Sequence, residues 1–235
     1  MGRERVSSAP GQPPDSPARD ASVIVLDTPQ GSARAHLHPA DGPAAALILG
    51  HGAGGGVGTP DLLATANVAC SLGISAALFE QPYLVAGRRS PAPAQQLDAA
   101  WMAAVAKLRE EMLRGLPLML GGRSAGARVA CRTAADLGAA AVLCLAFPVH
   151  PPGRGGDPAR SRLAELDAVR VPTLVVQGER DPFGMPPARP DRVVARVPGN
   201  HALRSTAAVA TAVGDWLSAW LAEHRPAPKR RARAH

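Results

Sequence analysis

The stretch Gly121-Gly122-Arg123-Ser124-Ala125-Gly126 decides the fold prediction for this chain of 235 residues. It follows the apolar run 116–120 and leads into the helical pattern 124–137, so the sequence predicts a strand, a sharp turn and a helix. Residues 122–126 match the motif Gly-x-Ser-x-Gly, in which the serine stands on a strained turn. The helix N-terminus favours negative charge that develops near the serine hydroxyl. The motif makes Ser124 the candidate nucleophile.

Apolar runs and helical patterns alternate on both sides of this motif. The expected strands cover 22–26, 33–37, 45–49, 74–79, 116–120, 140–146, 173–176 and 192–197, and the expected helices cover 61–72, 94–113, 124–137 and 205–222. Such alternation predicts an α/β fold with a mostly parallel sheet and helices on both faces. Only a short helical stretch, 160–166, lies between Phe147 and Thr173, so we expect little or no lid and a shallow, open site.

The chain has a net charge of +7 and a pI of about 10.5, and most of the excess positive charge lies at its C-terminal end. Residues 1–20 are neutral overall, and residues 225–235 carry +5, which leaves +2 on the rest. We expect a disordered arm at 1–20, one folded domain at 21–224 and a disordered basic tail at 225–235. Aromatic residues make up only 3% of the chain, which opposes a dedicated nucleic-acid reader.

The cysteines and the apolar runs indicate in which cellular compartment the protein resides. Cys70, Cys131 and Cys144 form an odd set within apolar runs, which is typical of small buried residues in a reducing environment and not of a disulfide framework. No apolar stretch has the length of a membrane span, and the first residues lack the apolar core of a secretory signal. We expect a cytoplasmic protein, and the abundance of Arg, Ala, Gly and Pro favours a bacterial source with GC-rich codons.

A serine nucleophile needs a general base and an acid that orients the base. His201 follows the last expected strand in a Pro-Gly-Asn-His loop, which makes it the best of the seven histidines. Asp181 follows the buried run 173–176 and is the preferred acid, with Glu179 second and Asp157 third. The chain order Ser124, Asp181, His201, with each residue after a separate strand, is that of hydrolases with a Gly-x-Ser-x-Gly turn.

The run 45–49 continues into the glycine-rich loop 50–56. Glycines allow a backbone N–H to approach a substrate closely, so we assign the oxyanion donors to the N–H groups of Ala125 and Ala53, with Gly54 as an alternative. His51 is expected to be a structural part of this loop. The loop lacks the Lys-Ser/Thr ending of a phosphate-binding P-loop and the register of a dinucleotide site. The chemistry requires no metal and no organic cofactor.

Basic side chains also follow several expected strands. If Arg88, Arg89, Arg123 and His150 converge on the serine, the site favours an anionic acyl substrate. The alternative is that these arginines form structural salt bridges with groups such as Glu80.

The motifs together resemble the α/β-hydrolase superfamily over roughly residues 21–224, which includes dienelactone-hydrolase-like enzymes. More narrowly, the chain resembles the α/β-hydrolase-like family of the testis-expressed Tex proteins and the third subunit of the nonspecific-lethal chromatin complex. The segments that carry the likeness are 50–55, 82–83, 86–89, 121–124, 147–153 and 177–184. The resemblance implies a sheet of about seven or eight strands and a triad at Ser124, Asp181 and His201. It implies no particular substrate.

The sequence therefore predicts a serine hydrolase that acts on a small ester, thioester or lactone. The alternative is a non-catalytic protein-interaction module on the same fold, as the chromatin relative suggests. The three matched groups argue against that alternative, because a pure scaffold has no need of them.

Overall fold

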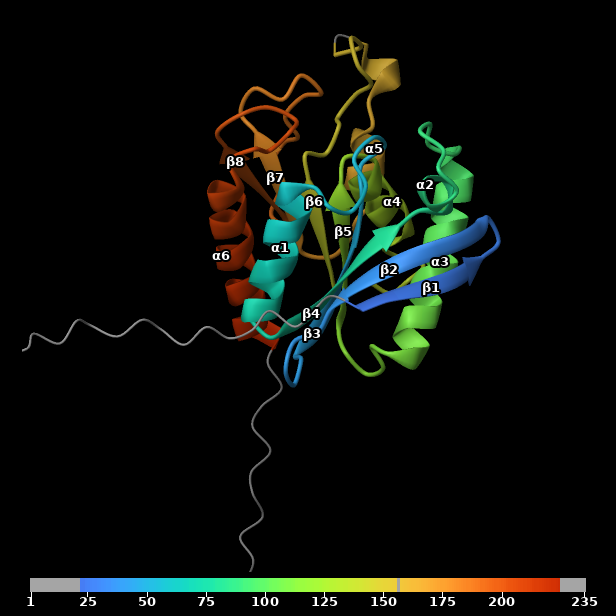
Figure 1. The fold of residues 1–235 in the computed structure, drawn as a ribbon. Helices are drawn as coiled ribbons and strands as arrows, with labels where there is room; N and C mark the ends of the chain where they lie inside the picture. The colour runs from blue at the N-terminus through green and yellow to red at the C-terminus, as the bar shows by residue number, and fades with distance from the viewer. Residues whose placement is uncertain (1–21, 156, 225–235) are drawn as a thin grey trace, which may run out of the picture.

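The computed structural model describes residues 22–155 and 157–224, and these form one mixed sheet with helices on both faces (Figure 1). The described part of the chain contributes eight strands in the order β1-β2-β4-β3-β5-β6-β7-β8. The first two junctions, β1 with β2 and β2 with β4, are antiparallel, and every other junction is parallel. The expected mostly parallel α/β sheet is confirmed. The arm predicted at 1–20 and the tail predicted at 225–235 lie outside the described residues.

The strands fall where the apolar runs predicted them, with ends that differ by a few residues. Their bounds are β1 Ser22–Thr28, β2 Gly31–His38, β3 Ala45–Gly50, β4 Ile74–Glu80, β5 Leu118–Arg123, β6 Ala141–Leu145, β7 Thr173–Gly178 and β8 Arg192–Val197. Strands β3, β6 and β7 are buried along their whole length. Central strands of a sheet covered on both faces are continuously apolar, which is why these runs were visible in the sequence.

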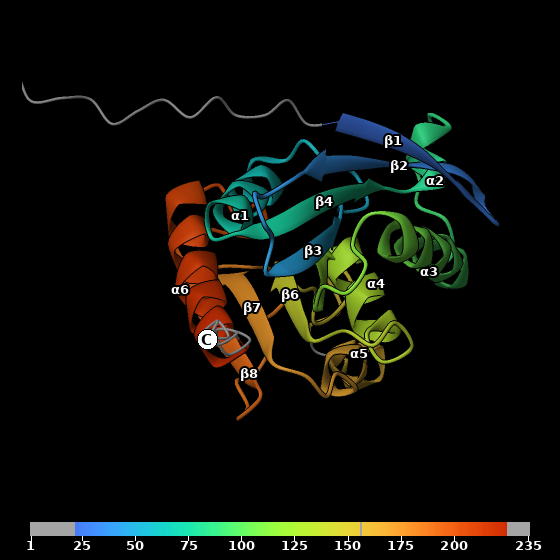
Figure 2. The same ribbon diagram turned by 90° about the horizontal axis from the view of Figure 1, so that it is seen from below.

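Helices cover the two faces of the sheet unequally (Figure 2). Helices α1 (Pro60–Ser71) and α6 (Thr206–His224) cover one face, and α3 (Ala94–Glu111), α4 (Ala125–Thr133) and α5 (Leu163–Asp167) cover the other. The short α2 (Pro82–Val85) was not expected, because one turn leaves no periodic pattern. Helix α4 is shorter than predicted: residues 134–137 form turns that end at Gly138, whose φ of +60° suits a glycine after a helix.

Each helical layer encloses its own hydrophobic core. Leu97, Trp101, Val105 and Leu108 line the buried face of α3, and the centroid of the Trp101 ring lies 5.4 Å from that of the Phe79 ring, which it meets edge-on. On the other face, Val209, Val213 and Leu217 of α6 pack with α1. The remaining core is mostly Ala, Val and Leu, so the helices approach the sheet closely.

The segment between β6 and β7 carries no inserted domain in its described residues. It holds a 3-10 turn, Pro158–Arg160, and the short α5. The expectation of little or no lid is confirmed. Cys131 and Cys144 are buried with their Sγ atoms 3.5 Å apart, and Cys70 is partly buried. Among the described helices, none combines the length and the apolar character that a membrane crossing requires.

The junction of β3 with α4 leaves no space for a side chain. A Cβ atom at Gly126 would overlap the carbonyl group of Gly50 and would lie 2.9 Å from the Gly50 Cα atom. Both partners are backbone, so neither can move away without moving its whole element. The second glycine of the motif is therefore required by packing between β3 and α4.

We expect Gly126→Ala to lower the free energy of unfolding by about 1–3 kcal/mol, because the added methyl group forces β3 and α4 apart. Urea unfolding followed by circular dichroism measures the change. Gly58→Ala is the matched control, since a Cβ atom there meets nothing within 4 Å. Equal unfolding midpoints for the two variants would contradict the packing argument.

Candidate active site

Ser124 stands between the end of β5 and the first residue of α4, at the carboxyl edge of the sheet. Its φ of +52° and ψ of −105° are unusual for a residue with a side chain. The Ser124 N–H donates to the Leu145 carbonyl at 2.9 Å, which ties the turn to β6. The strained turn and this hydrogen bond together hold the serine side chain clear of the helix.

His201 and Asp181 lie next to this serine. The Ser124 Oγ atom is 3.0 Å from His201 Nε2, and His201 Nδ1 is 2.8 Å from Asp181 Oδ2. With the Nδ1–H donated to the carboxylate, Nε2 is free to accept the serine proton. The Asp181 side chain is only 1% exposed, whereas that of His201 is 18% exposed. Of the other carboxylates considered, Glu179 is exposed and Asp157 caps the turn at Ala159.

Gln177 and Phe183 position this pair, although neither belongs to the catalytic residues predicted from the sequence. The buried Gln177 Nε2 group donates to Asp181 Oδ2 at 2.9 Å and to the Gly184 carbonyl at 2.8 Å. The Phe183 N–H donates to the other Asp181 oxygen at 2.9 Å, and the Phe183 ring lies 4.3 Å from the His201 ring. The sequence does place Gln177 at the end of a buried strand. Because a buried amide needs hydrogen-bond partners, this position could have predicted that Gln177 binds a nearby polar group.

The glycine-rich loop that follows β3 also lies beside Ser124. Ala53, Ser124 and Ala125 line one cavity. In the described chain the Ala53 N–H has no hydrogen-bond partner, and Ala125 begins α4, where a helical N–H lacks an acceptor in the preceding turn. The Tyr83 hydroxyl donates to the Ala53 carbonyl at 3.0 Å and holds the loop.

His51 has a structural place in the loop, as expected. Its Nδ1–H donates to the Gly52 carbonyl at 2.7 Å, and its Nε2 accepts the Gln81 N–H at 3.0 Å. Burial lowers the pKa of His51 and outweighs the Gly52 carbonyl and the Glu80 carboxylate, which raise it. The ring therefore stays neutral, with both nitrogens occupied by the backbone.

Arg123 does not extend toward a substrate. Its Nε donates to the buried Asp61 carboxylate at 2.8 Å, and its Nη2 donates to the His201 carbonyl at 2.9 Å. The guanidinium thus links α1 to the histidine loop. Arg123 therefore forms a structural salt bridge, which was the alternative to substrate binding, and its partner is Asp61. Glu80, the partner suggested from the sequence, lies near Arg34 and His36 instead.

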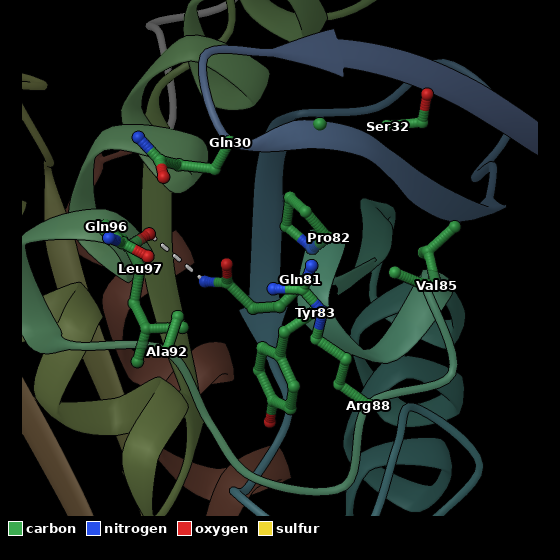
Figure 3. A pocket seen from close by; sticks show the side chains of 12 residues that line it. Gln30, Ser32, Gln81, Pro82, Tyr83, Val85, Arg88, Ala92, Gln96 and Leu97 are labelled. Carbon is green, nitrogen blue, oxygen red and sulfur yellow. Dashed lines mark hydrogen bonds between the residues drawn. The ribbon is translucent and has the colours of Figure 1, made fainter.

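The other basic residues expected at the substrate do not converge on Ser124 either. Arg88 lines a separate cavity of about 350 Å³ between the β1–β2 turn and α2, together with Gln30, Gln81 and Gln96 (Figure 3). Arg89 is exposed. The His150 Nδ1–H donates to the Pro151 carbonyl at 3.0 Å.

The cavity that contains Ser124 has a volume of about 320 Å³. Its wall is mainly apolar and includes three prolines, Pro91, Pro148 and Pro152, and the Phe183 ring. In residues 22–155 and 157–224, no group of three or more His, Cys, Asp or Glu side chains could hold a metal ion.

Comparisons with solved structures give the same fold at low sequence identity. XC6422 from Xanthomonas campestris, described as an α/β serine hydrolase without lid, is 19% identical over 86% of this chain and 95% of its own, with a TM-score of 0.68. The dienelactone hydrolase of Anabaena variabilis is also 19% identical, over 86% and 97%, with a TM-score of 0.66. Est1E from Butyrivibrio proteoclasticus is 14% identical over 85% and 99%, with a TM-score of 0.64.

A comparison with curated protein sequences gave no match. The family model described as alpha/beta hydrolase domain matches residues 43–196, which include β3, the Gly-x-Ser-x-Gly turn and the loop of Asp181. Because this match spans more than half of the chain and contains the strand–turn–helix unit around Ser124, the chain belongs to the alpha/beta hydrolase family.

Proposed function

We propose that the protein is a serine hydrolase that acts on a small ester, thioester or lactone through an acyl-enzyme. The observation that supports this proposal is the continuous contact from Ser124 Oγ to His201 Nε2 at 3.0 Å and from His201 Nδ1 to Asp181 Oδ2 at 2.8 Å. Three side chains from separate loops meet in the order and geometry that acyl transfer needs.

In the first half-reaction, Ser124 Oγ attacks the carbonyl carbon while His201 Nε2 takes the hydroxyl proton. The carbonyl oxygen becomes an oxyanion, which the Ala125 and Ala53 N–H groups stabilise, with Gly54 as the alternative to Ala53. The tetrahedral intermediate then collapses, and His201 gives its proton to the leaving alcohol, thiol or ring oxygen. Asp181 keeps the imidazole oriented and stabilises its positive charge.

In the second half-reaction, water takes the place of the leaving group. His201 accepts a proton from the water, whose oxygen attacks the acyl-enzyme carbonyl, and the same donors hold the second oxyanion. Collapse of this intermediate returns the proton to Ser124 Oγ and releases the carboxylic acid. Besides the substrate and water, these steps use only the side chains and backbone N–H groups named above.

The cavity supports a small substrate. About 320 Å³ lies at the lower end of the volumes that small-molecule sites have, and no lid covers it in the described residues. Kinship with the Tex-type family, a cytoplasmic location in a bacterium and the absence of dedicated nucleic-acid binding stay predictions. The interaction module stays the alternative, and it requires a Ser124 without nucleophilic reactivity.

A fluorophosphonate probe should label the wild-type protein at Ser124, because the contact with His201 makes the hydroxyl nucleophilic. Ser124→Ala should lose all labelling, and mass spectrometry of the labelled peptide identifies the site. Ser205→Ala, at a serine just before α6, is the control and should label as the wild type does. A folded wild-type protein that fails to label would support the interaction module.

Gln177→Met should reduce the labelling rate constant about tenfold, because the Asp181 carboxylate loses the amide donor that fixes its direction. Methionine keeps the volume of the side chain and removes its hydrogen bonds. Thermal unfolding shows whether the variant is folded at the assay temperature. An unchanged rate constant in the folded variant would mean that Asp181 is positioned without Gln177.

Arg123→Met should lower kcat for neutral and anionic esters by the same factor. The guanidinium is bound to Asp61 and to the His201 carbonyl, so its loss disturbs the histidine loop rather than a substrate contact. Steady-state kinetics with one ester of each charge measures the two factors. A selective loss for the anionic ester would restore Arg123 as a substrate ligand.

A further inference from the structure

Three arginines that the sequence analysis did not select line the cavity that holds Ser124. They are Arg128 and Arg132 of α4 and Arg162, the residue just before α5. The Arg162 backbone is fixed, because its N–H donates to the Val149 carbonyl at 2.7 Å. The positive charge beside the nucleophile thus comes from α4 and from the segment that precedes α5.

Two of these guanidinium groups are neutralised by carboxylates. Arg128 binds both Glu165 oxygens, with Nε 2.8 Å from Oε2. Arg132 binds both Asp98 oxygens, with Nε 2.8 Å from Oδ2, and its Nη1 lies 3.2 Å from Glu165 Oε1. The ion pairs join α3, α4 and α5, and their role is structural.

Arg162 differs from its two neighbours. In the described part of the chain its guanidinium has neither a carboxylate within ion-pair distance nor a hydrogen bond, and the nearby Glu165 already serves Arg128 and Arg132. The side chain is half-buried. Partial burial, followed by the Arg128 guanidinium, lowers the pKa of Arg162, although the Glu165 carboxylate raises it. The three guanidinium groups therefore exceed the two carboxylates, Asp98 and Glu165, by one positive charge, and Arg162 is the one to which residues 22–155 and 157–224 offer no partner.

We propose that Arg162 binds a carboxylate of the substrate, so that the site selects esters, thioesters or lactones that carry a second, anionic group. The proposal rests on the proposed hydrolase function and adds the substrate class to it. Arg162 thereby replaces the residues expected from the sequence to bind an anionic substrate, which do not meet at Ser124: Arg88, Arg89, Arg123 and His150.

The chemistry of the wall favours this pairing. A guanidinium presents its donors in a planar fork that matches the two oxygens of a carboxylate. Pro148, Pro152 and the Phe183 ring line the same cavity and keep its dielectric constant below that of water, which strengthens the attraction. A neutral substrate would leave the Arg162 charge partly desolvated and unpaired, whereas a carboxylate would compensate it. Discrimination therefore lies in substrate binding, and KM is the parameter that reports it.

Two matched pairs of esters test the proposal. The first pair, 4-nitrophenyl hemiglutarate and 4-nitrophenyl valerate, places a carboxylate or a methyl group at the end of the acyl chain. The second pair, 4-acetoxybenzoate and its methyl ester, places the difference on the leaving group. Arg162→Ala should raise KM for the anionic member of at least one pair about tenfold or more and leave its neutral partner within about twofold. The pair that responds shows which half of the substrate Arg162 faces.

Arg160→Ala is the control for net charge. Arg160 lies two residues away with its side chain 64% exposed, so the substitution removes the same charge outside the cavity and should move neither pair. Arg162→Lys should recover only part of the preference, because an ammonium group keeps the charge and loses the fork. Equal changes in KM for the neutral and anionic members of both pairs would overturn the assignment of Arg162.

A binding measurement separates this proposal from the hydrolase proposal. Titration calorimetry with Ser124→Ala, which cannot form an acyl-enzyme, gives Kd for monoethyl glutarate and for 4-acetoxybenzoate without turnover. Adding Arg162→Ala should weaken at least one of them about tenfold or more. If neither carboxylate binds, or if Arg162→Ala changes neither Kd, the anion site is wrong whatever the labelling of Ser124 shows. Binding without any labelling would instead leave the anion site in place and refute the hydrolase.

Discussion

The packing of Gly126 on Gly50 is the constraint on which the site depends. Because no side chain separates them, the first turn of α4 rests on the end of β3, and the loop that leaves β3 begins next to Ser124. Ala53, from the loop after β3, and Ala125, from the first turn of α4, accordingly line one cavity with Ser124. A larger residue at either position would move Ser124 away from the proposed oxyanion donors, so the glycines serve geometry and not flexibility.

Around this junction, hydrogen bonds from nearby and from distant residues hold the proposed catalytic groups in place. Gln177 and the Phe183 backbone bind the two Asp181 oxygens, and Arg123 binds the loop of His201. The Tyr83 hydroxyl binds the Ala53 carbonyl and secures the loop after β3. Each proposed catalytic group thus has a partner that limits its motion, which is what acyl transfer without a lid requires, since the cavity remains open to water.

The basic residues of the chain have different roles in different places. Most of the net charge lies in residues 225–235, outside the described structure. Within the domain, Arg123, Arg128 and Arg132 are bound to carboxylates of the helices α1, α5 and α3, respectively. Arg162 is the cavity arginine whose charge these carboxylates leave uncompensated, so it is the residue proposed to bind an anionic substrate. The bulk charge says little about substrate preference, because one half-buried charge beside the cavity is screened by solvent less than several exposed charges are.

The sequence by itself determined the order of strands and helices, the strained turn at Ser124 and the three residues proposed as the triad. These features are local: apolar runs define buried strands, and a glycine pattern defines a turn. Only the tertiary structure decided which cation faces the cavity. The partner of Arg123 lies 62 residues away and that of Arg128 lies 37 residues away, so no local pattern shows that these charges are neutralised. Position at a strand end brought a residue to the correct edge of the sheet, but the direction of its side chain depended on neighbours from other elements.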